Sequence, residues 1–334
     1  MLRHRLPLLV TGIAGVAGYS AFRRLHALYP DQVIGIRPHL NWRMQGPGII
    51  AQDSEDAEGM RLLFDRFGFR SVLNAIGSCA LKSCELDPAM ARRINVDSAF
   101  VLTDIARRHG ARVVHVSSDL VFSGTKGGNH VETDPTDPVT VYGKTMVDAE
   151  NAFLTLLPQA AVLRMSLPMG PSFNGHAGAI DWIKSRFRAD RPATLYYDEV
   201  RSCTYVDDLD RVFERFLAGD EAGLYHLGGP RASTLFKIAQ IVNRVGGYAP
   251  ELLHGCNRIE AGPIPPRAGD VSMCSDKLIR LFGENPFQPW PLGDELWPTD
   301  RRWHFERPSD EARSLQEIHR RLYRYEAVER ANSA

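Results

Sequence analysis

The chain has 334 residues, more than one domain core usually holds, which predicts two lobes or a large domain carrying a smaller one. Hydrophobic residues make up 44% and charged residues 24%, as in ordinary soluble globular proteins, so long disorder and fibrous repeats are excluded. Lys plus Arg and Asp plus Glu both total 40, a formal net charge of +0, so nucleic acid and anionic lipid are not expected as partners.

The cysteine pattern and the hydropathy indicate where in the cell the protein is expected. The five cysteines show neither paired nor zinc-finger spacing, so we expect no metal site and a reducing cytoplasm. No stretch approaches the ~18 uninterrupted apolar residues of a membrane span. Membrane insertion is therefore not expected.

The first apolar run, residues 6–11, ends in glycines, and apolar side chains then recur at helical spacing from Phe22 until Pro30. This pattern predicts a strand, a turn and a helix, and it favours a buried strand over a secretory leader. Further apolar runs at 32–36 and 48–52 predict the next two strands, as right-handed crossovers require.

The turn reads Thr11-Gly12-Ile13-Ala14-Gly15-Val16-Ala17-Gly18. Glycines directly after a strand let the backbone approach a pyrophosphate, whose charge is met by N–H groups at the helix N-terminus. A simple packing turn is the alternative. The motif predicts a dinucleotide site, with Gly12, Ile13, Gly15, Val16 and Gly18 against the cofactor.

The residue that ends the second strand is Arg37. A carboxylate at this point accepts the ribose 2′-OH of NAD, whereas a cation accommodates the 2′-phosphate of NADP. Arg37 therefore favours NADPH while still allowing NAD, with Arg43 as a second candidate contact; a solvated surface arginine is the alternative. Asp53, at the end of the third strand, is a candidate contact for adenine or an exposed turn residue.

The alternation of strands and helices continues. Residues 71–76 and 113–116 predict strands, and between them Asp87 can cap a helix that begins at Pro88 and ends at Gly110. The resulting fold class is α/β, with a Rossmann-type, doubly wound parallel sheet.

Beyond about residue 165, proline and glycine break the regular pattern. We predict an NAD(P)-binding Rossmann domain over 1–165, to which 193–228 return, and a smaller, loop-rich substrate-binding lobe over 166–192 and 229–334. Residues 309–328 place apolar side chains on one helical face and predict a helix that packs on its own domain, with binding to a partner as the alternative.

Hydroxyl groups mark the end of the strand 113–116, where Ser117 and Ser118 follow, and Tyr142 opens the next helix. Open α/β sheets bind ligands at the carboxyl ends of their strands. A tyrosine placed there can supply a phenolic proton to a carbonyl group that accepts a hydride.

At this point the chain resembles the extended short-chain dehydrogenase/reductase family and, within it, the dTDP-4-dehydrorhamnose reductase branch. The resemblance covers most of the chain and is carried by the glycine turn, Asn74-Ala75 with Glu85 and Pro88, Asn95-Val96, Ser117-Ser118-Asp119 with Val121-Phe122, Tyr142-Gly143-Lys144-Thr145, Leu163-Arg164, Thr204-Tyr205-Val206-Asp207-Asp208, Gly223-Leu224-Tyr225-His226-Leu227, and Pro266-Arg267 with Asp270-Val271-Ser272.

The resemblance implies roles for several residues. Ser118 corresponds to the Ser or Thr that hydrogen-bonds the reacting oxygen, and Tyr142 to the proton donor. The cofactor-binding positions continue with Ala75, Gly77, Tyr142 and Met146. Arg201 and Arg267 fall where family members hold a nucleotide-sugar, often by its diphosphate. Lys82 stands where the reductases usually carry an acid, as a pocket cation for the substrate or as a solvated loop residue.

The chain departs from the family motif Tyr-x-x-x-Lys, because Met146 stands in place of the lysine. The family's lysine holds the nicotinamide ribose and lowers the pKa of the tyrosine. Lys144 is a poor substitute, since two residues along a helix turn by roughly 200°. Without the cation the phenol keeps a pKa nearer about 10, which weakens it as a base for oxidation but not as a proton donor in reduction.

Three functions stay open at this point. The leading one is an NADPH-dependent reductase of a keto group on a nucleotide-activated deoxysugar. The second is a nucleotide-sugar epimerase or dehydratase that retains its NAD(P). The third is a non-catalytic, cofactor-binding regulatory subunit, for which the beta subunit of methionine adenosyltransferase is the precedent. The sequence does not identify the sugar, and a homodimer is compatible with it.

Overall fold

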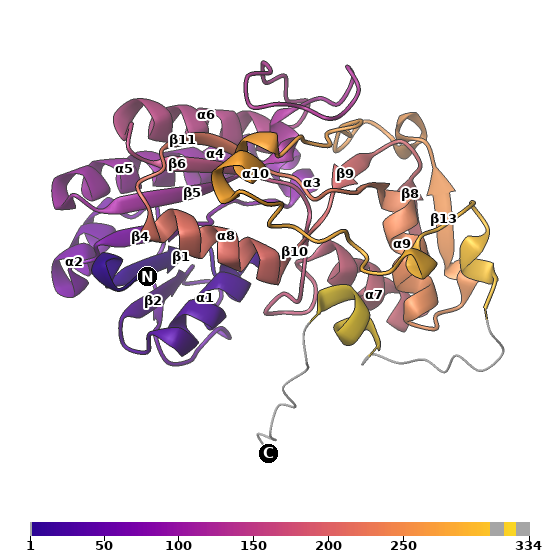
Figure 1. Ribbon diagram of the computed structural model, residues 1–334, viewed down its shortest axis with the longest axis horizontal. Coiled ribbons are helices and arrows are strands. Elements are labelled where there is room, and N and C mark those ends of the chain that lie inside the picture. Colours follow the sequence, from indigo (N-terminus) through magenta and orange to yellow (C-terminus); the bar gives the residue numbers. More distant parts are fainter. Residues whose placement is uncertain (1, 308–316, 325–334) are drawn as a thin grey trace.

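Seven parallel strands form the centre of the structure, a computed structural model that describes residues 2–307 and 317–324 (Figure 1). The sheet order is β11-β6-β5-β4-β1-β2-β3, and every neighbouring pair is parallel. The strands are β1 (Leu8–Thr11), β2 (Val33–Arg37), β3 (Ile49–Ala51), β4 (Ser71–Asn74), β5 (Arg112–Ser118), β6 (Ala161–Met165) and β11 (Gly223–Leu227). The order reverses at β1, so the predicted doubly wound sheet is confirmed.

Helices cover both faces of this sheet. Because successive side chains of a strand point to opposite faces, Leu8 and Val10 pack in one apolar core while Leu9 packs in another. The first core includes residues of α1 (Val16–Leu28) and α8 (Val206–Ala218), and the second includes residues of α2 (Ala57–Phe67), α5 (Ser98–His109) and α6 (Val141–Leu156). Strands buried on both faces explain the nearly continuous apolar runs in the sequence.

The predicted helix between Asp87 and Gly110 has correct ends but an interrupted interior. Asp87 caps it by accepting a hydrogen bond from the Met90 N–H, and Gly110 ends it with φ +62°. Between α4 (Pro88–Arg92) and α5 lies a π-helical turn, Arg93–Asp97. Such turns occur often at functional sites, and this one carries the buried Asn95.

A smaller lobe lies on the other side of the molecule (right in Figure 1) and has its own core. Its elements are α7 (Ala179–Arg188), α9 (Leu235–Val245), the pair β8 (Ala193–Tyr196) and β13 (Leu253–Cys256), the pair β9 (Val200–Ser202) and β12 (Ala232–Thr234), and the pair β7 (Pro168–Met169) and β10 (Thr204–Tyr205). Of the range 193–228, α8 and β11 lie with the central sheet, whereas β8 and β9 pair with strands of the smaller lobe.

Two short helices complete the surroundings of the site. The helix α3 (Leu81–Leu86) follows β4 and contacts α6, and α10 (Asp276–Phe282) packs against β11.

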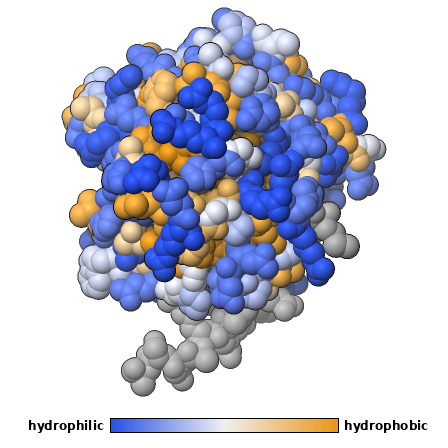
Figure 2. Space-filling view, turned by 90° about the vertical axis from the view of Figure 1, so that its left-hand side faces the viewer, coloured by the Kyte–Doolittle hydropathy of each residue, from blue (hydrophilic) through white to orange (hydrophobic). Residues whose placement is uncertain are grey.

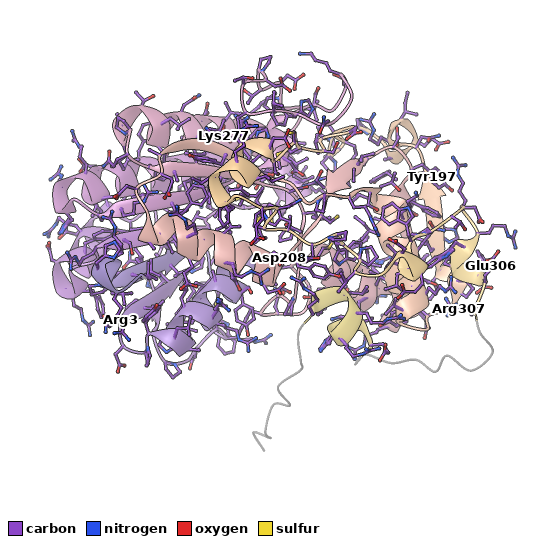
Figure 3. The ribbon with its side chains drawn as sticks, in the orientation of Figure 1. Arg3, Tyr197, Asp208, Lys277, Glu306 and Arg307 are labelled. Atoms are coloured by element: carbon purple, nitrogen blue, oxygen red, sulfur yellow. The ribbon has the colours of Figure 1, made fainter. Side chains whose placement is uncertain are left out.

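The last described segment, 317–324, is tied to both lobes. Arg324 Nη2 donates to Asp208 Oδ1 of α8 at 2.6 Å, and Tyr323 Oη donates to Asp181 Oδ1 of α7 at 2.6 Å. Figure 3 shows Asp208 near the middle of the molecule, between the lobes. Of the helix predicted over 309–328, residues 309–316 and 325–328 lie outside the described residues, while 318–323 form a π-helical turn with Ile318 and Leu322 buried.

The surface agrees with the composition. In the described part of the chain, no helix combines the length and the apolar character needed to cross a membrane. Figure 2, which faces the left-hand side of Figure 1, shows hydrophobic patches separated by hydrophilic residues.

Candidate active site

The glycine turn lies between β1 and α1 and divides into two kinds of position. A Cβ atom on Gly12, whose φ is +67°, would lie 2.1 Å from the Ala75 carbonyl oxygen, and one on Gly18 would lie 2.4 Å from the Gly12 carbonyl oxygen. The fold itself therefore requires these two glycines. A Cβ on Gly15 would meet only the Gly12 carbonyl oxygen, at an ordinary 3.5 Å.

Gly15 is also the N-cap of α1 and offers no side chain to the N–H groups of the first turn. Because no side chain caps this end of the helix, the N–H groups of the first turn, beginning at Val16, can donate to a ligand. The packing-turn alternative accounts for Gly12 and Gly18 but not for Gly15. The turn thus fits the pyrophosphate of a dinucleotide.

Arg37 and Asp53 lie at the same edge of the sheet, at the ends of β2 and β3. Arg37 Nε donates to the Met44 carbonyl oxygen at 2.6 Å, and Arg37 Nη1 donates to the Pro38 carbonyl oxygen at 3.1 Å. Asp53 accepts a hydrogen bond from the His39 N–H at 3.1 Å, and its Oδ2 lies 3.0 Å from His39 Nδ1. Both residues thus brace the β2–β3 connection, a role that the sequence did not indicate.

The end of β5 supplies the predicted serine. Ser118 is buried; its hydroxyl accepts a hydrogen bond from the Leu120 N–H at 3.2 Å and donates to Asp119 Oδ1 over a long 3.3 Å. Asp119 is 0% exposed and accepts from Ser166 Oγ at 2.6 Å. The serine therefore stands beside a fully hydrogen-bonded carboxylate.

Capping places Tyr142 in the first turn of α6. Thr140 is the N-cap and accepts a hydrogen bond from the Gly143 N–H at 2.9 Å, while Glu85 accepts one from the Val141 N–H at 2.7 Å. These bonds fix where the helix begins, and hence which way its second residue points.

Tyr142, Met146 and Gly77 meet at one point. A Cβ on Gly77 would lie 3.7 Å from Tyr142 Oη and 3.8 Å from Met146 Sδ. Met146 is only 1% exposed, whereas Lys144 is exposed to solvent and does not replace the missing lysine. The structure therefore brings together three of the predicted cofactor-binding positions.

Burial raises the pKa of the Tyr142 phenol well above its ordinary value of 10. Cys79 and the Asp119 carboxylate raise this pKa further, while the Ser118 hydroxyl and the Arg201 guanidinium lower it. At neutral pH the phenol therefore carries its proton and can donate it.

Asn95 was named in the sequence only as part of a matching motif, yet it links two sides of the site. Its Oδ1 accepts a hydrogen bond from the Ser78 N–H at 2.8 Å, and its Nδ2 donates to Thr145 Oγ1 at 2.8 Å. Thr145 in turn donates to the Tyr142 carbonyl oxygen at 2.8 Å. The π-helical turn thus holds the loop after β4 against the first turn of α6.

The two predicted arginines lie on either side of Glu199. Arg201 is 7% exposed and binds Asp119 through two bonds, Nε to Oδ2 at 2.7 Å and Nη2 to Oδ1 at 2.5 Å. Arg267 is about a quarter exposed and stacks on the Tyr196 ring. The remaining predicted substrate contact, Lys82, is exposed on α3.

A protonated phenol beside a serine hydroxyl, at the sheet edge where a glycine turn admits a dinucleotide, can pass a proton to a carbonyl group that receives a hydride. Fold and site together define an NAD(P)-dependent oxidoreductase of the short-chain dehydrogenase/reductase type.

Within this class, the chain belongs to the family described as RmlD substrate binding domain, whose model matches residues 7–292. It is 30% identical over 238 residues to dTDP-4-dehydrorhamnose reductase of Aggregatibacter actinomycetemcomitans, which covers 67% of this chain and 79% of the relative. It is 26% identical over 306 residues to methionine adenosyltransferase 2 subunit beta of Xenopus laevis, covering 88% of this chain and 89% of the relative.

Among solved structures, dTDP-4-dehydrorhamnose reductase from Bacillus anthracis in complex with NADP has the same fold. The TM-score is 0.72 at 18% identity, over 85% of this chain and 95% of that chain. The resemblance expected from the sequence motifs is confirmed.

Proposed function

We propose that this protein is an NADPH-dependent reductase of a keto group on a nucleotide-activated deoxysugar. The observation that carries the proposal is the buried, protonated Tyr142 beside Ser118, because reduction of a keto group requires a proton donor. The name of the relative from A. actinomycetemcomitans supports the substrate class.

Different residues would bind the different parts of the cofactor. Gly12, Ile13, Gly15, Val16 and Gly18 would hold the pyrophosphate, with Arg37 and Asp53 towards the adenosine end. The nicotinamide end would lie against Ala75, Gly77, Tyr142 and Met146. When bound, the nicotinamide supplies the hydride.

Two residues of the chain would then act on the oxygen of the keto group, one by a hydrogen bond and one by transfer of a proton. The Ser118 hydroxyl exchanges its long bond to Asp119 for one to this oxygen, and Tyr142 Oη donates its proton to it. No ammonium is present at Met146 to stabilise the resulting phenolate, so the phenol regains a proton from water readily. These residues therefore favour reduction over oxidation.

The substrate side would use Arg267, Arg201 and Lys82. Arg267 has an edge open to solvent and suits a diphosphate oxygen. Arg201 would contribute positive charge below the diphosphate, since two of its nitrogens already donate to Asp119. Lys82 is exposed on α3, where a direct contact would require the substrate to reach the surface of that helix.

A regulatory subunit without turnover is the second candidate. It is favoured by Met146 in the lysine position and by the similarity to methionine adenosyltransferase 2 subunit beta over 88% of this chain. An epimerase or dehydratase is less favoured, because the oxidation of its substrate needs a lowered tyrosine pKa and the pKa of Tyr142 is raised.

Consumption of NADPH with a panel of 4-keto nucleotide sugars tests the proposal. The unmutated protein should turn over at least one of them, and Tyr142→Phe should lower turnover by about a hundredfold or more, the usual scale of a lost general acid. If Tyr142→Phe leaves turnover unchanged, Tyr142 is not the proton donor. Tight NADPH binding with no turnover on any substrate favours the regulatory subunit.

We also propose a cytoplasmic location and a homodimer. All five cysteines are free thiols, which suits a reducing compartment.

The homodimer would form at a hollow of about 440 Å³ between α5 and α6. This hollow is bordered by Phe100 and Leu156, which are 46% and 45% exposed, and a second copy could fill it. Light scattering on the purified protein tests the assembly, and a monomer mass would contradict it.

A further inference from the structure

Four charged side chains form a continuous row beneath the proposed diphosphate site. Asp119 pairs with Arg201, Arg201 Nη1 lies 3.8 Å from Glu199 Oε1, and Glu199 Oε2 lies 3.8 Å from Arg267 Nη1. The side chains of Asp119, Arg201 and Glu199 are 0%, 9% and 3% exposed, whereas that of Arg267 is 25% exposed. Arg267 is thus the outermost member, and Glu199 lies buried under it.

Glu199 differs from Asp119 in how it is held. Asp119 accepts hydrogen bonds from Ser166 and Arg201, whereas Glu199 Oε2 and Arg267 Nε are buried with no hydrogen-bond partner among the described residues. At 3.8 Å, Glu199 receives charge compensation from the arginines but no hydrogen bond. A buried carboxylate that lacks hydrogen bonds gains little from being ionised. Of the two carboxylates in the row, Glu199 is therefore the easier one to protonate.

The row contains two carboxylates, Asp119 and Glu199, and two guanidinium groups, Arg201 and Arg267, so its ionised charges cancel. The adjacent Arg258 is paired with Asp198 at 3.1 Å. The proposed anion site therefore has no net positive charge before a ligand arrives. The pKa of the Glu199 carboxyl is raised above its ordinary value, chiefly by burial and further by Asp119, although the Arg201, Arg267 and Arg258 guanidinium groups oppose the rise. The ionised form of Glu199 thus depends on guanidinium charge.

We propose that Glu199 takes up a proton from solution when a nucleotide diphosphate group binds at Arg267. The diphosphate brings negative charge close to Glu199 and competes with it for the Arg267 guanidinium, so the neutral carboxylic acid becomes the favoured form. The inference rests on the proposed function, since it needs Arg267 to contact the diphosphate.

Linkage fixes the sign of the pH effect. If the complex holds one proton more than the free components, affinity for the ligand falls as the pH rises, at all pH values where that uptake occurs. Glu199 would then make substrate binding tighter in mildly acidic conditions and would limit it in alkaline ones.

Calorimetric titration with dTDP-glucose tests the inference. This probe carries the diphosphate but no keto group to reduce, and its two phosphates do not titrate near neutral pH. Titrations in two buffers of different ionisation enthalpy, at one pH, count the protons exchanged. We expect an uptake of a measurable fraction of one proton, which Glu199→Gln abolishes while tightening binding by about threefold to tenfold, because a nearby negative charge is gone.

Asp210→Asn is the matched control. Asp210 is another buried carboxyl group, on α8, where burial raises its pKa to about 7 and Ser20 of α1 donates a hydrogen bond to it. It is absent from the charged row, so its replacement should leave proton uptake unchanged.

Infrared difference spectroscopy of the unmutated protein gives a second readout that does not depend on a folded variant: a protonated-carboxyl band should appear when dTDP-glucose is added. Binding without proton uptake, or uptake unchanged in Glu199→Gln, overturns the inference. Failure of dTDP-glucose to bind at all counts instead against the proposed function.

Discussion

Met146 is the residue whose chemistry most shapes the site. Its thioether is buried four residues after Tyr142, where the family motif has an ammonium group. A neutral side chain there gives no stabilisation to a phenolate, and burial already raises the pKa of the phenol. The same burial would desolvate the charge of a lysine at this position.

Met146→Lys should therefore shift the pH–rate profile towards lower pH, because an ammonium beside the phenol lowers its pKa. It should also destabilise the fold by about 1–3 kcal/mol, the cost of a buried and unpaired polar group. The pH dependence of NADPH oxidation and chemical denaturation measure the two effects. Lys144→Met, at the exposed position of the same helix, is the control and should change neither.

Arg37 combines a charge with a structural role, and two substitutions separate them. Arg37→Asp should narrow or invert a preference for NADPH over NADH, because a carboxylate repels the 2′-phosphate and accepts a 2′-OH. Arg37→Lys keeps the charge but loses the fork that binds the Met44 and Pro38 carbonyls, so it should weaken both cofactors alike. Calorimetry with each cofactor decides, and equal affinities in the unmutated protein would refute the assignment.

At the scale of elements, the sequence predicted the parts whose signals are local. The strands appear as continuous apolar runs, and Asp87 and Gly110 mark the ends of a helix by capping. The π-helical turn inside that helix could not be predicted, because Asn95 is held there by Ser78 and Thr145, which are distant in sequence. Glu199 was missed because only the fold brings Arg267, which is distant in sequence, to the same carboxylate as the nearby Arg201.

Asn95→Ala should loosen the contact between the loop after β4 and α6. We expect a loss of stability of about 1–3 kcal/mol, because the Ser78 N–H is left without its acceptor, and a lower turnover number as Tyr142 loses support. Denaturation and steady-state kinetics measure both. Lys144→Ala, at an exposed position of α6 outside the proposed dimer contact, is the control. If the two variants behave alike, the Asn95 link has no positioning role.

At the scale of the whole molecule, buried histidines set the response to acid. Burial lowers the pKa of His115 to about 3 and that of His226 and His304 to about 4, each from an ordinary 6.5. Burial raises the pKa of Asp210 to about 7. The histidines bind protons only when the protein unfolds, whereas Asp210 binds one more readily when folded.

The stability of the protein should therefore fall as the pH drops from about 6.5 towards 4, because the unfolded chain gains protons at three histidines. Each contributes on the order of 2–3 kcal/mol across this window, and the opposing gains at Asp210 and Glu199, two buried carboxyl groups whose pKa values are raised, offset part of the loss. Denaturant titrations at a series of pH values measure it. Stability that is constant or rising over this window contradicts the assignment of neutral buried histidines.

The Asp119–Arg201 pair has a consequence for motion. Asp119 follows β5 of the central sheet and Arg201 belongs to β9 of the smaller lobe, so the bond crosses from one lobe to the other. A hinge movement that parted them would break two charge-assisted hydrogen bonds, each worth about 1.5–3 kcal/mol. Fewer than about one molecule in a hundred would then be open at equilibrium. Ligands therefore meet a preorganised enzyme, whose groups need little rearrangement before the chemistry begins.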